Sequence, residues 1–126
     1  MISTHKESNE VLYPDEDIVT LTNIDLDELK WMAMLNVRRR IRLCVHHTVE
    51  DDVHEMIIYH PKGTYVSPHK HMGKEESFHL ICGEIDCIMF DNDGNMVKVL
   101  PMGEYSSGKT FYYRIPSGTY HTQIFR

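Results

Sequence analysis

The stretch GTYVSPHKHMGKEESFHLICG, residues Gly63–Gly83, decides the fold predicted for this chain. His69 and His71 are separated by one residue in a run typical of a β-strand. Because side chains at i and i+2 leave the same face of a strand, both imidazoles point into one space. Glu76 follows five residues later and leads into an apolar run that ends at Gly83. Two imidazoles and a carboxylate that converge from adjacent strands suit a divalent first-row metal ion.

The composition indicates a soluble globular protein. The chain has 126 residues, of which 41% are hydrophobic and 25% are charged. We expect a polar N-terminal arm or an edge segment over residues 1–17 and one domain over residues 18–126. The net charge of -6 argues against nucleic acid and anionic membrane as partners. No apolar run approaches the roughly 20 residues of a membrane span, and the N-terminal segment MISTHKESNE lacks the apolar core of a secretory signal.

Three cysteines bear on the cellular compartment. Cys44, Cys82 and Cys87 form no CxxC motif, their number is odd, and each lies in an apolar run. This pattern favours buried reduced thiols over a disulfide or a thiolate metal site. We therefore expect a cytoplasmic protein.

One helix and a series of short strands are predicted. Residues 18–21 are β-branched enough for a strand, and Asp25 with Glu28 resembles a capping box that opens a helix over residues 25–36. Turn signals rich in Gly, Pro, Asn and Asp then separate eight strand candidates, which suggests a closed double-sheet or barrel architecture. These candidates are residues 42–48, 53–60, 63–71, 76–82, 85–90, 96–100, 110–115 and 119–125.

An arginine-rich segment, Arg38–Arg42, follows the predicted helix. Arg40 and Arg42 share one strand face, and arginine is the residue suited to bidentate capture of a carboxylate or phosphate. They are therefore candidate substrate-binding residues. The alternative is a solvated strand start or a structural ion-pair site, for which residues 50–52 (Glu-Asp-Asp) are possible partners.

A second motif near the C-terminus supplies a further ligand. Residues 116–121 read PSGTYH, which is a turn followed by a strand whose histidine is His121. Together with the spacing of the first stretch, this matches both sequence motifs of the cupin superfamily. The resemblance implies a double-stranded β-helix, or jelly-roll barrel, that holds one metal ion through His69, His71, Glu76 and His121. Glu76 is preferred to Glu75 because only Glu76 keeps the six-residue gap to the glycine that closes the first motif.

A narrower resemblance covers nearly the whole chain. The short helix, the arginine-rich segment, His47, the run YVSPHKH and the run FDNDG are similar to those of the WbuC-type cupins. Those are small bacterial metalloproteins associated with O-antigen and surface-polysaccharide biosynthesis. The chain departs from the general pattern at Phe125, where Asn is common, and it stops at Arg126, where cupins often continue. The resemblance therefore favours barrel closure by the N-terminal strand or by a neighbouring subunit, and we expect a homodimer.

Three kinds of function fit such a site. Three histidines and one carboxylate leave open positions on a zinc, iron, manganese, nickel or cobalt ion, as catalysis requires. The first hypothesis is a metal-dependent enzyme acting on a small anionic or sugar-derived substrate, as an isomerase, epimerase or lyase, or as a dioxygenase if the metal is iron. The second is a non-catalytic sugar or acid sensor, and the third is a purely structural ion. In the enzyme, His47, Tyr65 or Tyr113 moves a proton and Gln123 orients the substrate or a metal-bound water.

Overall fold

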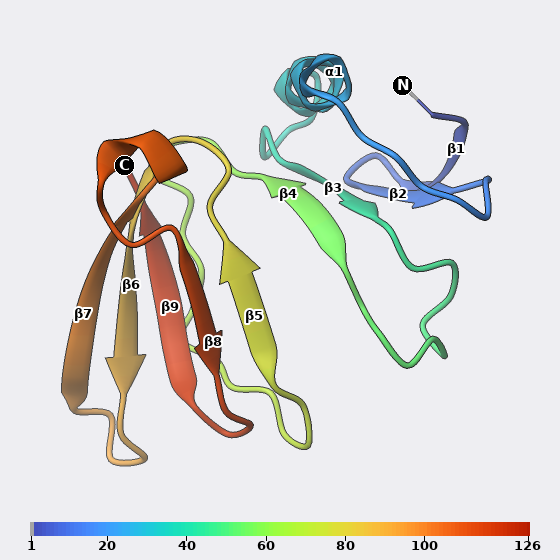
Figure 1. The fold of residues 1–126 in the computed structure, drawn as a ribbon. Coiled ribbons are helices and arrows are strands. Elements are labelled where there is room, and N and C mark those ends of the chain that lie inside the picture. Colours follow the sequence, from blue (N-terminus) through green and yellow to red (C-terminus); the bar gives the residue numbers. More distant parts are fainter. Residues whose placement is uncertain (1) are drawn as a thin grey trace. The chain divides into compact units, whose positions relative to one another are not determined.

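Alternating apolar and polar residues form short β-strands, and the regular structure of the fold is mainly β with one α-helix. The computed structural model describes residues 2–126. The chain divides into two compact units, one that ends at Pro61 and one that comprises Lys62–Arg126. Each unit is described by itself below, and both are drawn in Figure 1.

The first unit contains a four-stranded sheet in the order β1-β2-β3-β4. β1 and β2 form an antiparallel hairpin, β2 pairs with β3 in parallel, and β3 pairs with β4 antiparallel. The hairpin occupies the stretch expected to be a polar arm or an edge segment, and β1 lies at the sheet edge. The strands are β1 (Thr4–Ser8), β2 (Val11–Pro14), β3 (Ile41–Cys44) and β4 (Met56–Tyr59).

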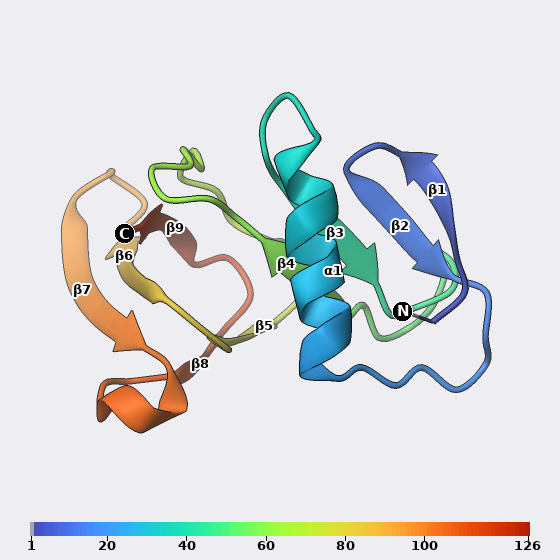
Figure 2. The same ribbon diagram turned by 90° about the horizontal axis from the view of Figure 1, so that it is seen from above.

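Helix α1 (Asn23–Met34) covers one face of this sheet and makes the core of the first unit. Figure 2 shows the helix crossing the strands of its own unit. Its N-cap is Thr22, whose backbone N–H donates to the Asp25 carboxylate at 2.6 Å. The predicted cap was therefore three residues late, because Asp25 acts as the reciprocal acceptor within the first turn and not as the cap itself. The buried apolar side chains are Leu12, Leu29, Ala33, Ile41 and Leu43.

The second unit contains two antiparallel sheets. One pairs β5 with β8, and the other has the order β7-β6-β9. Their facing apolar side chains form the core of this unit, which includes Leu80, Ile85, Cys87, Met102, Tyr113 and Ile115. The elements are β5 (Glu76–His79), β6 (Glu84–Phe90), β7 (Met96–Gly103), the 3-10 turn η1 (Tyr105–Ser107), β8 (Tyr112–Ile115) and β9 (Tyr120–Phe125).

Two predicted strands are wrong. Residues 18–21 form no strand and lead directly into α1. Residues 63–71 form no regular strand either, although His69 makes an isolated antiparallel bridge to His121. The strands of residues 2–126 form three separate sheets, and no closed barrel is present in this part of the chain.

Two further observations concern the cysteines and the helix. Cys44 and Cys87 are buried as expected, whereas Cys82 is exposed, because its position follows the end of β5. Within residues 2–126, no helix is long and apolar enough to cross a membrane.

Candidate metal centre

The two histidine motifs are joined by backbone hydrogen bonds. The N–H of His69 donates to the carbonyl of His121 at 3.0 Å, and the N–H of His121 donates back to His69 at 2.9 Å. Two residues further along, the N–H of Gly118 donates to the carbonyl of His71 at 2.8 Å. Gly118 has a φ of +81°, which explains the glycine of the second motif, since this left-handed conformation is costly for other residues. The turn therefore holds the C-terminal histidine directly opposite the first motif.

Three imidazoles converge at this bridge. One nitrogen each from His69, His71 and His121 lie within 4.8 Å of one another. The ring centroids of His69 and His121 are 4.4 Å apart, and those of His69 and His71 are 5.2 Å apart. The His121 side chain has no exposed surface, whereas 48% of the His71 side chain is exposed. The cluster is thus closed on its inner side and open to solvent at His71.

Backbone carbonyls fix the tautomer of two rings. Nδ1 of His69 lies 2.9 Å from the carbonyl oxygen of Ser67, and Nδ1 of His121 lies 2.9 Å from that of Thr119. Because a carbonyl only accepts, each Nδ1 must carry the proton. In the neutral ring, Nε2 then presents its lone pair to the centre of the cluster. A second partner of this kind is typical of metal-binding histidines.

Glu76 completes the cluster from the start of β5. Its Oε2 lies 2.6 Å from Nε2 of His121 and 3.9 Å from Nε2 of His71. Glu75, the alternative in sequence, forms an ion pair with Arg114 instead. The structure therefore brings all four predicted ligands together.

The contact between Glu76 and His121 is electrostatically unusual. Both atoms are buried, and within residues 2–126 neither makes a hydrogen bond of regular geometry although they lie 2.6 Å apart. Burial alone would raise the pKa of Glu76, but the neighbouring imidazoles, above all His121, outweigh it and lower that pKa. Burial likewise opposes protonation of His121, yet contact with the Glu76 carboxylate raises its pKa. The pocket therefore favours one extra positive charge between these two atoms.

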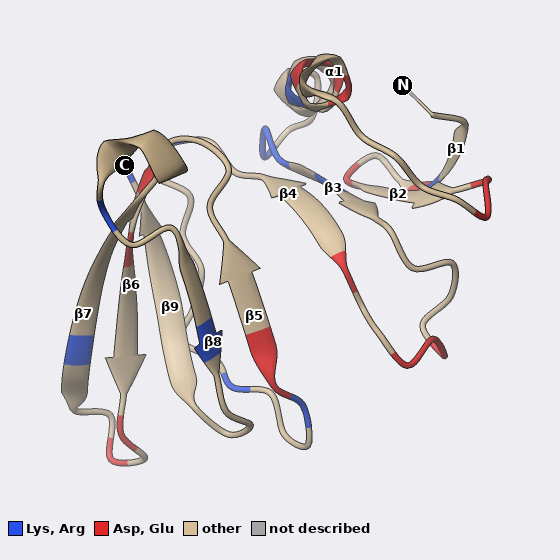
Figure 3. Cartoon of the chain, in the orientation of Figure 1, with Lys and Arg blue, Asp and Glu red and all other residues tan. Residues whose placement is uncertain are grey.

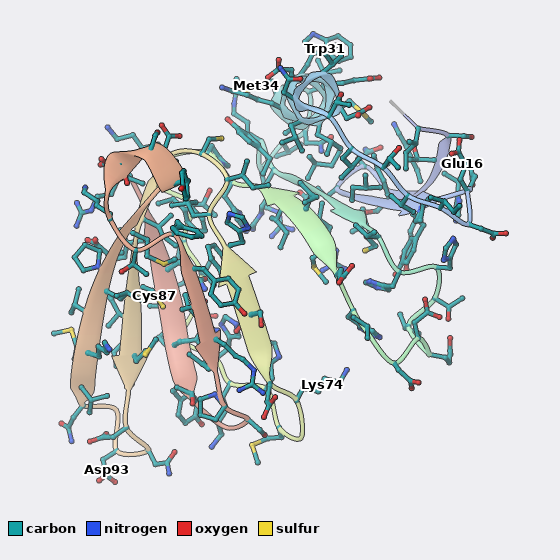
Figure 4. All side chains as sticks on the ribbon, viewed as in Figure 1. Glu16, Trp31, Met34, Lys74, Cys87 and Asp93 are labelled. Atoms are coloured by element: carbon teal, nitrogen blue, oxygen red, sulfur yellow. The ribbon has the colours of Figure 1, made fainter. Side chains whose placement is uncertain are left out.

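Tyr113 and Gln123 lie in the core of the same unit. The Gln123 amide Nε2–H donates to the Tyr113 hydroxyl at 2.9 Å, and the Tyr113 ring stacks on Phe78 with centroids 5.2 Å apart. Burial, together with the nearby Cys87 and Glu76, raises the pKa of Tyr113 far above its ordinary value. Tyr113 is therefore a fixed neutral hydroxyl. Figure 4 shows all side chains and labels Cys87 on the ribbon of this unit.

Tyr65 lies on the surface, with 78% of the residue exposed. It lines a hollow of about 420 Å³ between residues 63–68 and β9, which Gln123 also lines. The three clustered histidines are not among the residues that line this hollow. Tyr65 is thus near the C-terminal strand but outside the histidine cluster.

The remaining predicted residues belong to the first unit. Arg40 is half-buried just before β3, and Arg42 is exposed on β3. His47 holds its own loop, because its backbone N–H donates to Asp51 at 2.9 Å and its Nε2 lies 2.7 Å from the carbonyl oxygen of Glu16. The acidic partner of the arginine segment is Glu10, which pairs with Arg38 and faces Arg40, and not the acidic run at residues 50–52.

Sequence reasoning missed the residues that align the predicted ligands. Ser117 accepts from the N–H of Gly73 at 2.7 Å and donates to the carbonyl of His71 at 3.3 Å, so it anchors the loop after the first motif. The carbonyls of Ser67 and Thr119, each two residues before a ligand histidine, were missed because backbone acceptors leave no mark in side-chain identity.

Comparison with known proteins places the chain in a family. A family model described as a domain of unknown function (DUF6016) matches residues 21–102. The matched segment contains three of the four clustered residues and stops before His121. No curated protein and no solved structure matches the chain.

Proposed function

We propose that this chain, which belongs to the family described as a domain of unknown function (DUF6016), binds a divalent first-row transition metal ion. His69, His71, Glu76 and His121 are the proposed ligands. One observation carries the proposal: a buried carboxylate oxygen faces a buried imidazole nitrogen of fixed tautomer at 2.6 Å without a regular hydrogen bond.

The donor atoms fit such an ion. Ligands that each lie about 2.1 Å from one ion are about 3–3.5 Å from each other. Oε2 of Glu76 lies 2.6 Å from His121 and 3.9 Å from His71, distances that bracket this range. Three neutral imidazoles with one carboxylate suit zinc, iron, manganese, nickel or cobalt.

An ion held in this way supplies Lewis-acid chemistry, which polarises a carbonyl or hydroxyl oxygen of a bound molecule. The exposed side of the cluster, at His71, is where such a molecule would approach. We propose a small anionic or sugar-derived substrate and an isomerase, epimerase or lyase type of reaction, or a dioxygenase reaction if the metal is iron. On the inner side, Gln123 and Tyr113 hold each other in place and keep that wall rigid.

The wider context of the proposal comes from the cupin resemblance. We propose that the two sheets of the second unit are the metal-bearing part of a cupin-type jelly roll, and that the protein acts in surface-polysaccharide metabolism as a homodimer in the cytoplasm. Antiparallel pairing and the approach of His69 to His121 support the first point. The three unpaired thiols support the cytoplasmic location.

A second candidate function is a non-catalytic module that binds a sugar or acid at the metal ion. Tyr113 favours this binding module over an enzyme. Its hydroxyl has a strongly raised pKa and a fixed hydrogen-bond partner, and such a group is poorly suited to proton transfer. Thermal melting with sugar acids and nucleotide sugars separates the two candidates, since a bound ligand raises the midpoint by mass action. Stabilisation without turnover under any of the five metals would favour the binding module.

Elemental analysis of natively purified protein tests the metal proposal. The wild-type chain is expected to carry about one equivalent of a transition metal, and His71→Ala to lose most of it. His79→Ala is the matched control, because His79 lies in the same unit but stacks on Phe111, with ring centroids 5.4 Å apart, outside the cluster. Equal metal content in wild type and His71→Ala, or equal loss in both variants, would contradict the proposal.

A further inference from the structure

One face of the sheet in the first unit carries the two arginines singled out in the sequence. Ile41 and Leu43 of β3 are buried in the core beneath α1. Because strand side chains alternate, Arg40 and Arg42 lie on the other face. Figure 3 shows the positive segment between α1 and β3 in blue.

The neighbouring strand brings a histidine to the same face. Ile41 pairs with Tyr59 and Arg42 pairs with Ile58 across β3 and β4, so His60, the next residue after β4, comes level with Arg40. Burial and the positive charge of Arg40 lower the pKa of His60 to about 4. At neutral pH this imidazole is therefore uncharged and adds no repulsion between cations.

The guanidinium groups on this face are incompletely paired. Both carboxylate oxygens of Glu10 bond to Arg38, through Nε at 2.9 Å and through a second short contact at its terminal nitrogen. Nε of Arg40 lies 3.9 Å from Glu10 and is buried without a hydrogen bond to any described residue. Within residues 2–126, no carboxylate lies at ion-pair distance from Arg42. A buried donor on a cation is costly to leave unmet, and Nε of Arg40 lacks an acceptor among the described residues.

The acidic run that follows does not supply one. Asp51 accepts from the backbone N–H of His47 at 2.9 Å and contacts Thr48, and so serves its own turn. The backbone before β3 is also held in an unfavourable conformation, since Arg39 has a φ of +52°. Asn36 fixes this corner by donating its side-chain N–H to the carbonyl of Arg40 at 2.9 Å. The arginines are thus presented by a braced turn and not by a free loop.

We propose that Arg40, Arg42 and His60, which we call the arginine face, bind the carboxylate or phosphate group of a small molecule. Guanidinium groups offer paired N–H donors that match the oxygens of either group, and the neutral imidazole offers one more donor. The site is made by residues of the first unit alone. It therefore does not depend on the proposed metal centre.

Titration calorimetry with two probes, inorganic phosphate and malonate, tests this proposal on the full chain. Both probes are measured with wild type and in the His71→Ala background, which removes a metal ligand and so excludes binding at a metal ion. Arg42→Gln is the informative variant, because its exposed position lets the change leave the core intact. Its dissociation constant is expected to rise by about tenfold or more, as for loss of a charge-assisted hydrogen bond. Arg42→Lys keeps the charge without the paired donors, so its dissociation constant is expected to lie between those of wild type and Arg42→Gln.

Lys6→Gln is the matched control. It removes one positive charge from the same sheet, but Lys6 pairs with Leu12 and so belongs to the opposite face. The affinity of Lys6→Gln for either probe is expected to stay within about twofold of wild type, since screening weakens the effect of a distant charge. The proposal is supported if either probe binds, and if Arg42→Gln weakens binding most, Arg42→Lys weakens it less and Lys6→Gln leaves it nearly unchanged. Binding of neither probe, an unchanged Arg42→Gln, or an equal loss in Lys6→Gln would overturn it, and metal content measured on the same samples keeps this result separate from the fate of the metal centre.

Discussion

His46 in the first unit and His121 in the second are both buried, and the two are held in different ways. His46, in the first unit, lies beside the backbone of Glu55, with Nδ1 at 3.0 Å from its carbonyl oxygen and 3.2 Å from its nitrogen. Its ring stacks on His54, with centroids 4.4 Å apart and an interplanar angle of 11°. His121, in the second unit, bonds to a carbonyl through Nδ1 but turns Nε2 toward a carboxylate.

The difference between His46 and His121 shows how a buried structural histidine differs from a candidate metal ligand. His46 is packed between rings and has a backbone partner, so nothing further is needed to satisfy it. His121 has its tautomer set by a carbonyl while its other nitrogen meets a second group that is also an acceptor. Burial alone is therefore no evidence for a metal site. The metal proposal rests on two buried atoms, Nε2 of His121 and Oε2 of Glu76, that face each other.

The largest expected effect is stabilisation of the second unit alone by metal. At a free zinc concentration about 1,000 times the dissociation constant, the free energy of local unfolding should rise by about 4 kcal/mol for segments such as β9. Segments of the first unit, such as β3, should not change. Hydrogen exchange followed by mass spectrometry measures both in one sample. An equal gain in protection from exchange for β3 and β9 on adding zinc would contradict this difference between the units.

A core truncation in the first unit should have the converse effect. Leu43→Ala removes a side chain with no exposed surface, packed beneath α1, and should lower the free energy of unfolding of that unit by about 3 kcal/mol. Metal content should stay at the wild-type level, because no proposed ligand lies in that unit. Urea denaturation monitored by circular dichroism, beside elemental analysis, checks both statements. Loss of metal in Leu43→Ala would show that the ligand cluster needs the first unit.

His46→Leu sharpens the comparison directly. The variant removes the hydrogen bond between His46 Nδ1 and the backbone of Glu55, whose carbonyl still accepts from Val45, and should cost about 1 kcal/mol of stability. It should leave metal binding unaffected, whereas His121→Leu should abolish metal binding. Chelator competition on the two purified variants measures this. A metal-free His46→Leu would assign that histidine a role beyond packing.

The pH dependence of the first unit should follow His60. Its pKa of about 4 in the folded protein lies below the ordinary value of 6.5, so the unfolded chain takes up the proton first. Stability should therefore fall as the pH drops from about 6.5 toward 4, by roughly 1–2 kcal/mol, and should not change on this account above pH 7. Urea midpoints at pH 7 and pH 4.5 measure the loss, and His60→Gln should remove most of it. A loss of the same size in His60→Gln would assign it to other groups.

The smallest expected effect has the opposite sign. Arg39 is the non-glycine residue with positive φ among residues 2–126, and it lies in the first unit. Arg39→Gly removes the steric cost of that conformation at the expense of a more flexible unfolded chain, so stability should rise by less than about 1 kcal/mol. The melting temperature of the variant beside Arg39→Ala, which keeps the strain, checks the sign. A less stable Arg39→Gly would mean that the arginine side chain contributes more than its backbone costs.

Much of the candidate site could be predicted because its spacing is local. The separation of His69 and His71 by one residue is enough to send both side chains to one side of an extended segment. The choice of Glu76 over Glu75 rested on the six-residue gap to the glycine that closes the first motif, and Glu75 pairs with Arg114 instead. Helix boundaries were less predictable, because Asp25 is equally suited by residue type to the cap and to the third position of the first turn.

Other features depend on contacts between residues far apart in the chain. The pairing of Glu10 with Arg38 spans 28 residues, so no local pattern could have favoured it over the acidic run at residues 50–52. The hairpin of β1 and β2 was expected to be an arm because its composition is polar, yet β2 is stabilised by pairing with β3. Residues 63–71 have the composition of a strand but form no regular ladder with β9. They meet it at separate points, where Gly63 donates to Phe125, Val66 accepts from the Thr122 hydroxyl and His69 pairs with His121.

The sequence by itself determined which side chains can act as ligands and on which face of an extended segment they lie, since alternation and turn residues are encoded over a few positions. Only the tertiary structure decided that His121 lies opposite His69, that carbonyls set the tautomers of both rings, and that Glu76 meets His121 in a buried contact. These features arise from the meeting of segments about 50 residues apart. Burial of the surrounding apolar core brings these segments together. The type of a single residue indicates only whether it tends to be buried, and not which distant segment it will contact.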